Sequence, residues 1–168
     1  MPKDLRLCRE STSIPAFKGT YILVFSIGST LTVKSKRRSW TLEPGVYAYV
    51  GSAGGPGGLR SRLRRHLCSN VKRVWWHIDR VTVSDEYEPL LVVYCVGDWG
   101  TSVEHCISRC LSTMKVFKPI PGFGCSDDRL SLTHLYQLPS SRAALCNLVV
   151  CMVRCCTSYT SLLLGSSS

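Results

Sequence analysis

Two short strings, Gly-Thr-Tyr at residues 19–21 and Tyr-Val-Gly at residues 49–51, mark two segments with strong strand character. The first string opens the segment 20–27 (TYILVFSI), whose β-branched and aromatic residues predict a strand. The second closes the segment 45–50 (GVYAYV), in which small apolar residues alternate with tyrosines. This alternation predicts a second strand with both of its tyrosines on one face.

A glycine-rich loop and a basic helix follow the second strand. Five glycines fall within residues 51–58, and such a loop lets the backbone approach a ligand or another segment closely. In the next stretch, 59–67 (LRSRLRRHL), leucine recurs at every fourth position, which predicts an amphipathic helix. Because Arg60, Arg64 and Arg65 fall away from the leucines, this helix should present a basic face.

The remaining segments complete a small α+β fold. Hydrophobic periodicity and turn residues predict a hairpin loop at 34–38, a turn at 42–45, strands at 75–83, 89–96 and 133–138, a helix at 101–114 and a loop at 119–128. We therefore expect a small mixed or antiparallel sheet with three core strands, flanked by helices, in a single domain. This domain should occupy residues 18–139, between a leader at 1–17 and an apolar, Cys- and Ser-rich tail at 140–168.

The tail contains an apolar run at 143–164 that is long enough to span a bilayer. Arg154 within this run would cost about 2.5–3.5 kcal/mol at the bilayer centre, and polar residues and cysteines dilute the rest. We therefore expect a docked amphipathic helix or a poorly ordered extension rather than a membrane span.

The net charge of +10 is concentrated in one part of the chain. Residues 34–80 contain eleven Lys or Arg and only two acidic residues, a balance of +9, whereas the chain from residue 81 onward has a balance of −1. A one-sided basic field favours a polyanionic partner. A solvated basic surface without a partner is the alternative.

The ten cysteines show no pattern typical of a metal site, since no Cys-x-x-Cys is present. The first 17 residues lack the charged-then-apolar pattern of a signal peptide. We therefore expect reduced thiols, no disulfide scaffold and a cytoplasmic location, with the nucleoid or nucleus as alternatives.

The motifs resemble the GIY-YIG nuclease superfamily. More narrowly, the chain is similar to an uncharacterised GIY-YIG-like domain family that is fused to endonuclease III in some proteins. The resemblance rests on the two opening strings together with Arg-x-x-Arg-His (62–66), Trp-His-Ile-Asp (76–79), Pro-Gly-Phe-Gly-Cys-Ser-Asp (121–127) and His134-Leu135. It spans residues 19–138 and implies hydrolysis of DNA phosphodiester bonds with one divalent metal, Mg²⁺ or Mn²⁺.

The resemblance also implies roles for individual residues. Tyr21 and Tyr49 would be catalytic, with Tyr49 as general base if nearby arginines lower the pKa of its phenol. Arg62 would hold the phosphate, His66 would donate a hydrogen bond or move a proton, and Glu104 would bind the metal. Taken without the motifs, the two tyrosines are ordinary sheet aromatics and Glu104 is a surface residue.

Further residues are candidates for supporting roles. The basic residues expected to hold the nucleic acid are Arg60, Arg64, Arg65, Lys72 and Arg73. Secondary site candidates are Ser52, His77, Asp79, Asp127 and His134. His77 and Asp79 would share one face of the strand expected at 75–83, either as a hydrogen-bonded pair near the site or as a structural clasp.

Two departures from the family pattern leave the activity open. Asp128 and Leu130 stand where relatives carry a Cys-x-Cys pair, and Ser52 stands where some active relatives carry a lysine. The first hypothesis is an endonuclease acting on DNA, including branched or damaged DNA, without a small-molecule cofactor. The second is a nucleic-acid-binding module that keeps the fold but not turnover, and the third is an interaction or membrane-tethered protein that works through its tail.

Overall fold

The computed structural model describes residues 6–68, 73–125 and 131–165. In chain order its elements are α1 (Arg6–Glu10), the 3-10 turn η1 (Ser11–Ser13), β1 (Gly19–Ile27), β2 (Leu31–Lys34), β3 (Ser39–Leu42), β4 (Gly45–Ala53), α2 (Gly58–Leu67), α3 (His77–Thr82), β5 (Tyr87–Val96), α4 (Ser102–Thr113), β6 (Lys118–Pro119), β7 (Leu135–Leu138) and α5 (Arg142–Gly165).

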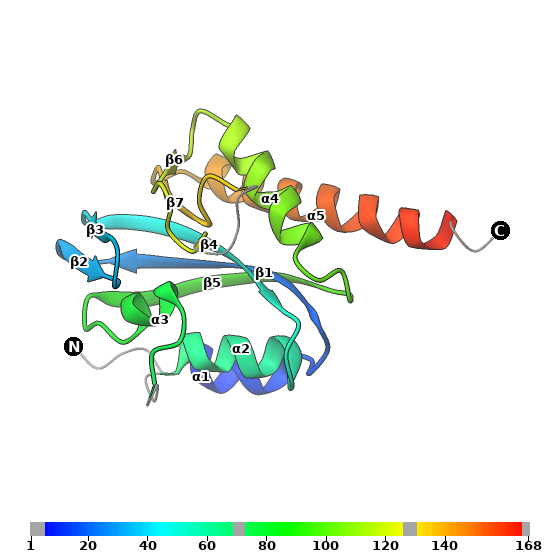
Figure 1. Cartoon of the computed structure of the whole chain (residues 1–168), viewed down its shortest axis with the longest axis horizontal. Coiled ribbons are helices and arrows are strands. Elements are labelled where there is room, and N and C mark those ends of the chain that lie inside the picture. The colour runs from blue at the N-terminus through cyan, green and yellow to red at the C-terminus, as the bar shows by residue number, and fades with distance from the viewer. Residues whose placement is uncertain (1–5, 69–72, 126–130, 166–168) are drawn as a thin grey trace.

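The central sheet has five antiparallel strands in the order β5-β1-β4-β7-β6, and β2 and β3 form a separate hairpin. In Figure 1 the sheet lies between α1, α2 and α3 on one side and α4 and α5 on the other. The predicted α+β fold, a largely antiparallel sheet flanked by helices, is therefore confirmed.

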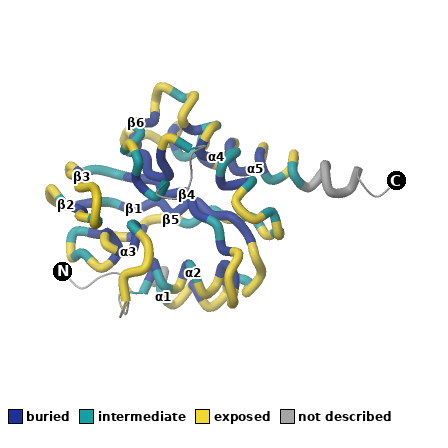
Figure 2. The backbone as a smooth tube through the Cα atoms, in the orientation of Figure 1, coloured by how far each residue is buried: buried dark blue, intermediate teal, exposed yellow. Residues whose placement is uncertain are grey.

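The strand β1 separates two apolar cores. Its residues Tyr21, Leu23 and Phe25 belong to the core on the α2 side, whereas Ile22 and Val24 belong to the core on the α4 side. Because side chains of a strand alternate between faces and both faces are covered, the strand is buried along most of its length (Figure 2). This explains why its sequence is a continuous apolar run.

The strand predicted at 75–83 is wrong, because this segment forms the short helix α3. The Asp79 carboxylate accepts hydrogen bonds from the backbone N–H groups of Trp75, at 2.8 Å, and Trp76, at 3.0 Å. An acidic side chain that satisfies free N–H groups stabilises the first turn of a helix. This local capping favours a helix in place of the predicted strand.

The tail forms the helix α5, which docks against α4 and β5. Its buried residues, which belong to the core on the α4 side, are Ala144, Leu148, Cys151, Met152 and Cys155. Of the two alternatives for the tail, the docked helix is confirmed. Within the described part of the chain, no helix has both the length and the apolar character needed to cross a membrane.

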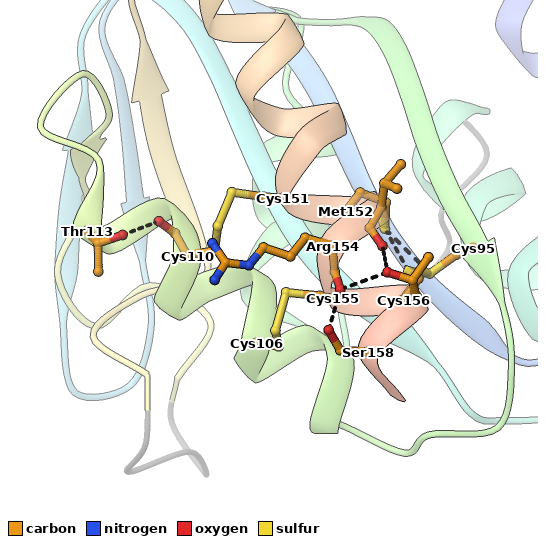
Figure 3. The surroundings of a disulfide bond; sticks show 12 residues. Cys95, Cys106, Cys110, Thr113, Cys151, Met152, Arg154, Cys155, Cys156 and Ser158 are labelled. Carbon is orange, nitrogen blue, oxygen red and sulfur yellow. Dashed lines mark hydrogen bonds between the residues drawn. A yellow bond between two sulfur atoms is a disulfide. The ribbon is translucent and has the colours of Figure 1, made fainter. Parts of the chain in front are cut away.

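Four disulfides contradict the expectation of reduced thiols without a disulfide scaffold. Two of them, Cys106–Cys155 and Cys110–Cys151, join α4 to α5, and Cys95–Cys156 joins β5 to α5 (Figure 3). The fourth, Cys8–Cys68, joins α1 to the end of α2. Partners lie 41 to 61 residues apart, so the spacing of neighbouring cysteines does not reveal pairs that form only when the helices pack.

Candidate active site

The two tyrosines of the opening strings lie side by side on the α2 face of the sheet, with ring centroids 6.4 Å apart. The antiparallel register places Tyr21 opposite Gly51. A Cβ atom at Gly51 would lie 2.5 Å from the Tyr21 phenol oxygen, a separation that packed atoms do not tolerate. The glycine of the second string therefore makes room for the tyrosine of the first.

His66 on α2 contacts Tyr21 directly, since its Nε2 lies 2.9 Å from the Tyr21 hydroxyl oxygen. Both side chains are buried. Burial is the largest effect on His66; together with Arg62 and Arg65, and against the opposing effect of Asp79, it lowers the pKa of His66 to about 3. The imidazole is therefore neutral at pH 7, and its Nε2 shares a hydrogen bond with the Tyr21 hydroxyl.

Asp79 ties α2 to α3. Its buried carboxylate accepts a hydrogen bond from Arg65 at 2.9 Å and lies 3.7 Å from His66 Nδ1. Burial opposes ionisation, but hydrogen bonds from Arg65 and from the backbone of Trp76 and Trp75 hold the pKa of Asp79 below its usual value. The sequence left two roles open for Asp79, a hydrogen-bonded pair with His77 near the site or a structural clasp. The contacts of Asp79 fit the structural clasp.

His77 does not join this cluster. Its ring packs edge-on against Trp40, with centroids 5.2 Å apart, and lies 6.0 Å from the Phe123 ring. The change from strand to helix explains the separation, because residues two apart on a helix do not share a face.

Arg62 stacks on an aromatic ring. Its guanidinium carbon lies 3.4 Å from the centroid of the Trp76 ring, and the guanidinium carbon of Arg65 lies 5.3 Å from the same centroid. A cation held over an indole keeps its charge in place without an ion-pair partner. The support of Arg62 by Trp76 was not predicted, because spacing along the chain does not reveal which ring a given arginine covers.

Glu104 at the start of α4 is buried and pairs with His134, whose Nδ1 lies 2.9 Å from the Glu104 Oε1 atom. Burial of His134 opposes its protonation, but hydrogen bonds with Cys125 and Glu104 raise its pKa to about 10. The pair is therefore ionic at neutral pH. Cys125, which sequence analysis did not select as a site residue, is one of two unpaired cysteines among the described residues.

Tyr49 lies within the electrostatic influence of both Arg62 and Glu104. Burial is the largest effect and raises the pKa of Tyr49; Glu104 raises it further, and Arg62 lowers it. Burial likewise raises the pKa of Tyr21. The expected lowering of the Tyr49 pKa by arginines is therefore outweighed by burial, and both phenols are protonated at neutral pH.

Most of the expected nucleic-acid-binding residues lie along a groove beside α2. Arg60, Arg64, Arg65 and Arg73 line this groove, and Arg60 also donates a hydrogen bond from Nε to the Ile14 carbonyl oxygen at 2.7 Å. Arg65 donates to the Arg73 carbonyl oxygen. Lys72, the fifth of these residues, lies outside the described residues.

The structure therefore brings together Tyr21, Tyr49, Arg62, His66 and Glu104, and it pairs His134 with Glu104. Ser52 is half-buried opposite Thr20 on β1, and strand alternation places it on the other face from Tyr49. Asp127, Asp128 and Leu130 lie outside the described residues. Among the described residues, no group of three or more His, Cys, Asp or Glu side chains is arranged to hold a metal ion.

Comparison with protein families finds a match over most of the chain. No curated protein and no solved structure matches the chain. One protein family matches residues 20–156 and thus continues past residue 139, where the sequence suggested the end of the domain, into α5. Since this match covers most of the chain, the protein belongs to the family described as domain of unknown function DUF123.

Proposed function

We propose that the protein is a metal-dependent endonuclease that hydrolyses phosphodiester bonds in DNA. The observation that carries this proposal is that Arg62 and Glu104 act on the same phenol, Tyr49, with opposite effects on its pKa. A phosphodiester hydrolase needs a cationic group for the phosphate and an anionic group for a metal ion beside the reacting atoms. The resemblance to GIY-YIG nucleases assigns these two residues the same roles.

Arg62 would bind the phosphate. The face of Trp76 holds the guanidinium group without consuming its N–H donors, so these donors remain available for two phosphate oxygens. Arg60, Arg64, Arg65 and Arg73 in the neighbouring groove would hold the flanking phosphates of the strand. Loss of an arginine in the groove should weaken DNA binding, whereas loss of Arg62 should chiefly slow the cleavage step.

The tyrosines would act first as hydrogen-bond donors. Since both phenols stay protonated in the free protein, Tyr49 can orient a water molecule or a phosphate oxygen. The Tyr21 hydroxyl is already committed to His66, so it positions the imidazole and the α2 helix that carries Arg62. Tyr49 would accept a proton only when extra positive charge lies close to it.

Glu104 is the residue that would hold Mg²⁺ or Mn²⁺. Its charge raises the pKa of both Tyr49 and Tyr21, so a cation bound at this carboxylate would act on the two phenols in the opposite direction. Mg²⁺ is commonly held by one or two carboxylates, with water and substrate phosphate completing its shell, so one carboxylate fits. When bound, the metal would polarise water and stabilise the leaving oxygen.

The test is cleavage of linear, nicked and branched DNA by the purified chain with Mg²⁺, Mn²⁺ or EDTA. We expect cleavage with either metal, none with EDTA, and a loss of about 100-fold or more in Glu104→Gln. Thermal melting and DNA binding of the variant must show that it folds and still binds DNA. Cleavage that continues in EDTA, or at an unchanged rate in Glu104→Gln, would contradict the proposal.

A nucleic-acid-binding module without turnover is the second candidate. It is favoured by the ion pair that already occupies one oxygen of Glu104 and by the raised pKa of both phenols. Wild-type protein that binds DNA but cuts none of the substrates with either metal would establish this alternative.

A further inference from the structure

The groove beside α2 combines positive charge with an exposed aromatic ring. Its volume is about 850 Å³, and the described residues that line it include Arg60, Arg64, Arg65 and Arg73 but no carboxylate. The indole of Trp75 also lines the groove and is 65% exposed. An exposed aromatic ring beside a basic groove offers a face on which a nucleic-acid base can stack.

The position of Trp75 is fixed although its ring is exposed. Its backbone N–H donates to Asp79 at 2.8 Å, and the same carboxylate holds Arg65 and Trp76. The two successive tryptophans differ in their surroundings. The guanidinium groups of Arg62 and Arg65 lie over the Trp76 ring, whereas no ring or cation among the described residues stacks on Trp75.

We propose that this groove binds an unpaired stretch of nucleic acid, with one base stacked on Trp75 and its phosphates held by the surrounding arginines. This inference rests on the proposed nucleic-acid partner and specifies its substrate class. Bases in a duplex are stacked on one another and present only their edges, so a protein indole cannot reach their faces. An unpaired base exposes its face, and aromatic platforms beside basic grooves bind single strands in this way.

The groove adjoins the candidate active site. Trp75 precedes Trp76, which lies under Arg62, and the arginines of the groove come largely from the same helix, α2. A base stacked on Trp75 would therefore place the strand close to the phosphate that Arg62 is proposed to hold. The preferred substrate should carry a single-stranded segment beside the cleaved bond, such as a flap, a gap or a splayed junction.

The test measures binding of the full chain, in EDTA, to oligo-dT, to oligo-rU of about 12 nucleotides, and to a matched duplex. We expect Trp75→Ala to weaken binding of the tighter-binding single strand by about 10-fold and to leave duplex binding within about 2-fold. Trp75→Phe should bind single strands with nearly the wild-type affinity. The quenching of tryptophan fluorescence that single-strand binding causes in wild type should be mostly lost in this variant. The control Val150→Ala, which removes a 57% exposed side chain from α5, should change neither affinity.

Equal single-strand binding by Trp75→Ala, Val150→Ala and wild type would overturn the inference. An equal loss for duplex and single strand in Trp75→Ala would also overturn it, because the ring would then serve no unpaired base. The proposed function can fail separately from this inference. If binding depends on Trp75 but no DNA is cleaved with any metal, the nuclease proposal is wrong and the groove is still a single-strand binding site. If wild type binds none of the three nucleic acids, both this inference and the proposed function are contradicted.

Discussion

The imidazole of His134 and the carboxylate of Glu104 form a buried ion pair, with Nδ1 and Oε1 2.9 Å apart. This pair joins the segment just before the strand β7 to the first turn of the helix α4. It therefore fixes the orientation of Glu104, the residue proposed to bind the metal, and it makes the stability of the protein depend on pH.

Alkaline pH should destabilise the protein through His134. Its pKa is about 10 in the folded state and about 6.5 when unfolded, so the folded state binds the extra proton between these values. The stabilisation is complete below about pH 6.5 and is lost as the pH rises toward 10. Urea denaturation between about pH 7 and 9.5 should show a falling free energy of unfolding, before unfolded tyrosines ionise.

The matched variant for this prediction is His134→Gln, which keeps hydrogen-bonding capacity but cannot titrate. Its free energy of unfolding should be lower than wild type near neutral pH by about 1–3 kcal/mol and should lack this slope. If the slope persists unchanged in the variant, His134 is not the group responsible.

Mild acid should destabilise the protein through His66. Its pKa is about 3 in the folded state and about 6.5 when unfolded, so the unfolded state binds more protons between these values. The free energy of unfolding should fall on acidification by up to about 1.4 kcal/mol per pH unit below 6.5. Denaturation of wild type and His66→Gln at about pH 5 to 6.5, above the range of ordinary carboxylates, measures this effect as the difference between the two slopes, because His134 titrates in both proteins. A variant with the wild-type pH dependence would show that the imidazole is not held neutral.

Removing the charge of Asp79 should loosen both α3 and the groove. Asp79→Asn leaves Arg65 partly buried without its ionic partner, which should cost about 3–5 kcal/mol of stability. The matched control Glu88→Gln changes an exposed carboxylate of β5 and should stay within about 0.5 kcal/mol of wild type. Chemical denaturation of the two variants measures this difference. Similar stabilities for Asp79→Asn and Glu88→Gln would show that Asp79 does not clasp the two helices.

The disulfides should account for much of the attachment of α5. The double variant Cys110→Ala/Cys151→Ala should be less stable than wild type by about 2–4 kcal/mol in the absence of reductant. The control Cys146→Ala removes an exposed unpaired thiol and should have little effect. Complete alkylation of all ten cysteines without reductant would show that the disulfides do not form. Because disulfides persist mainly in oxidising compartments, their presence in the isolated protein would weigh against the cytoplasmic location expected from the sequence.

The elements with strong local signals were predictable from the sequence. The apolar run of β1, the alternation of β4 and the leucine spacing of α2 each reflect a face that is buried in the structure. The structure of residues 75–83 was not predictable, because the helix there depends on capping by the Asp79 carboxylate. The disulfides also escaped prediction, since their partners meet only through the packing of α5 on α4 and β5.

The candidate site shows the same division. The two strings predicted that Tyr21 and Tyr49 lie in one site. The register places Gly51 opposite Tyr21, and the missing side chain of Gly51 leaves room for the Tyr21 ring. The support of Arg62 by Trp76 and the pairing of Glu104 with His134 depend on contacts between distant segments. The direction of the Tyr49 pKa shift also needed the structure, because only burial shows that desolvation outweighs the arginines.

The most direct test of the proposed function compares DNA cleavage by wild type, Arg62→Ala and Arg80→Ala with Mg²⁺, with DNA affinity measured in EDTA. Arg80 on α3 is exposed, so its loss removes the same charge away from the tyrosines. We predict metal-dependent cleavage by wild type and Arg80→Ala, and a rate about 100-fold or more lower in Arg62→Ala with DNA affinity reduced far less. Cleavage by Arg62→Ala at the wild-type rate, or no cleavage by wild type with any divalent metal, would contradict the account.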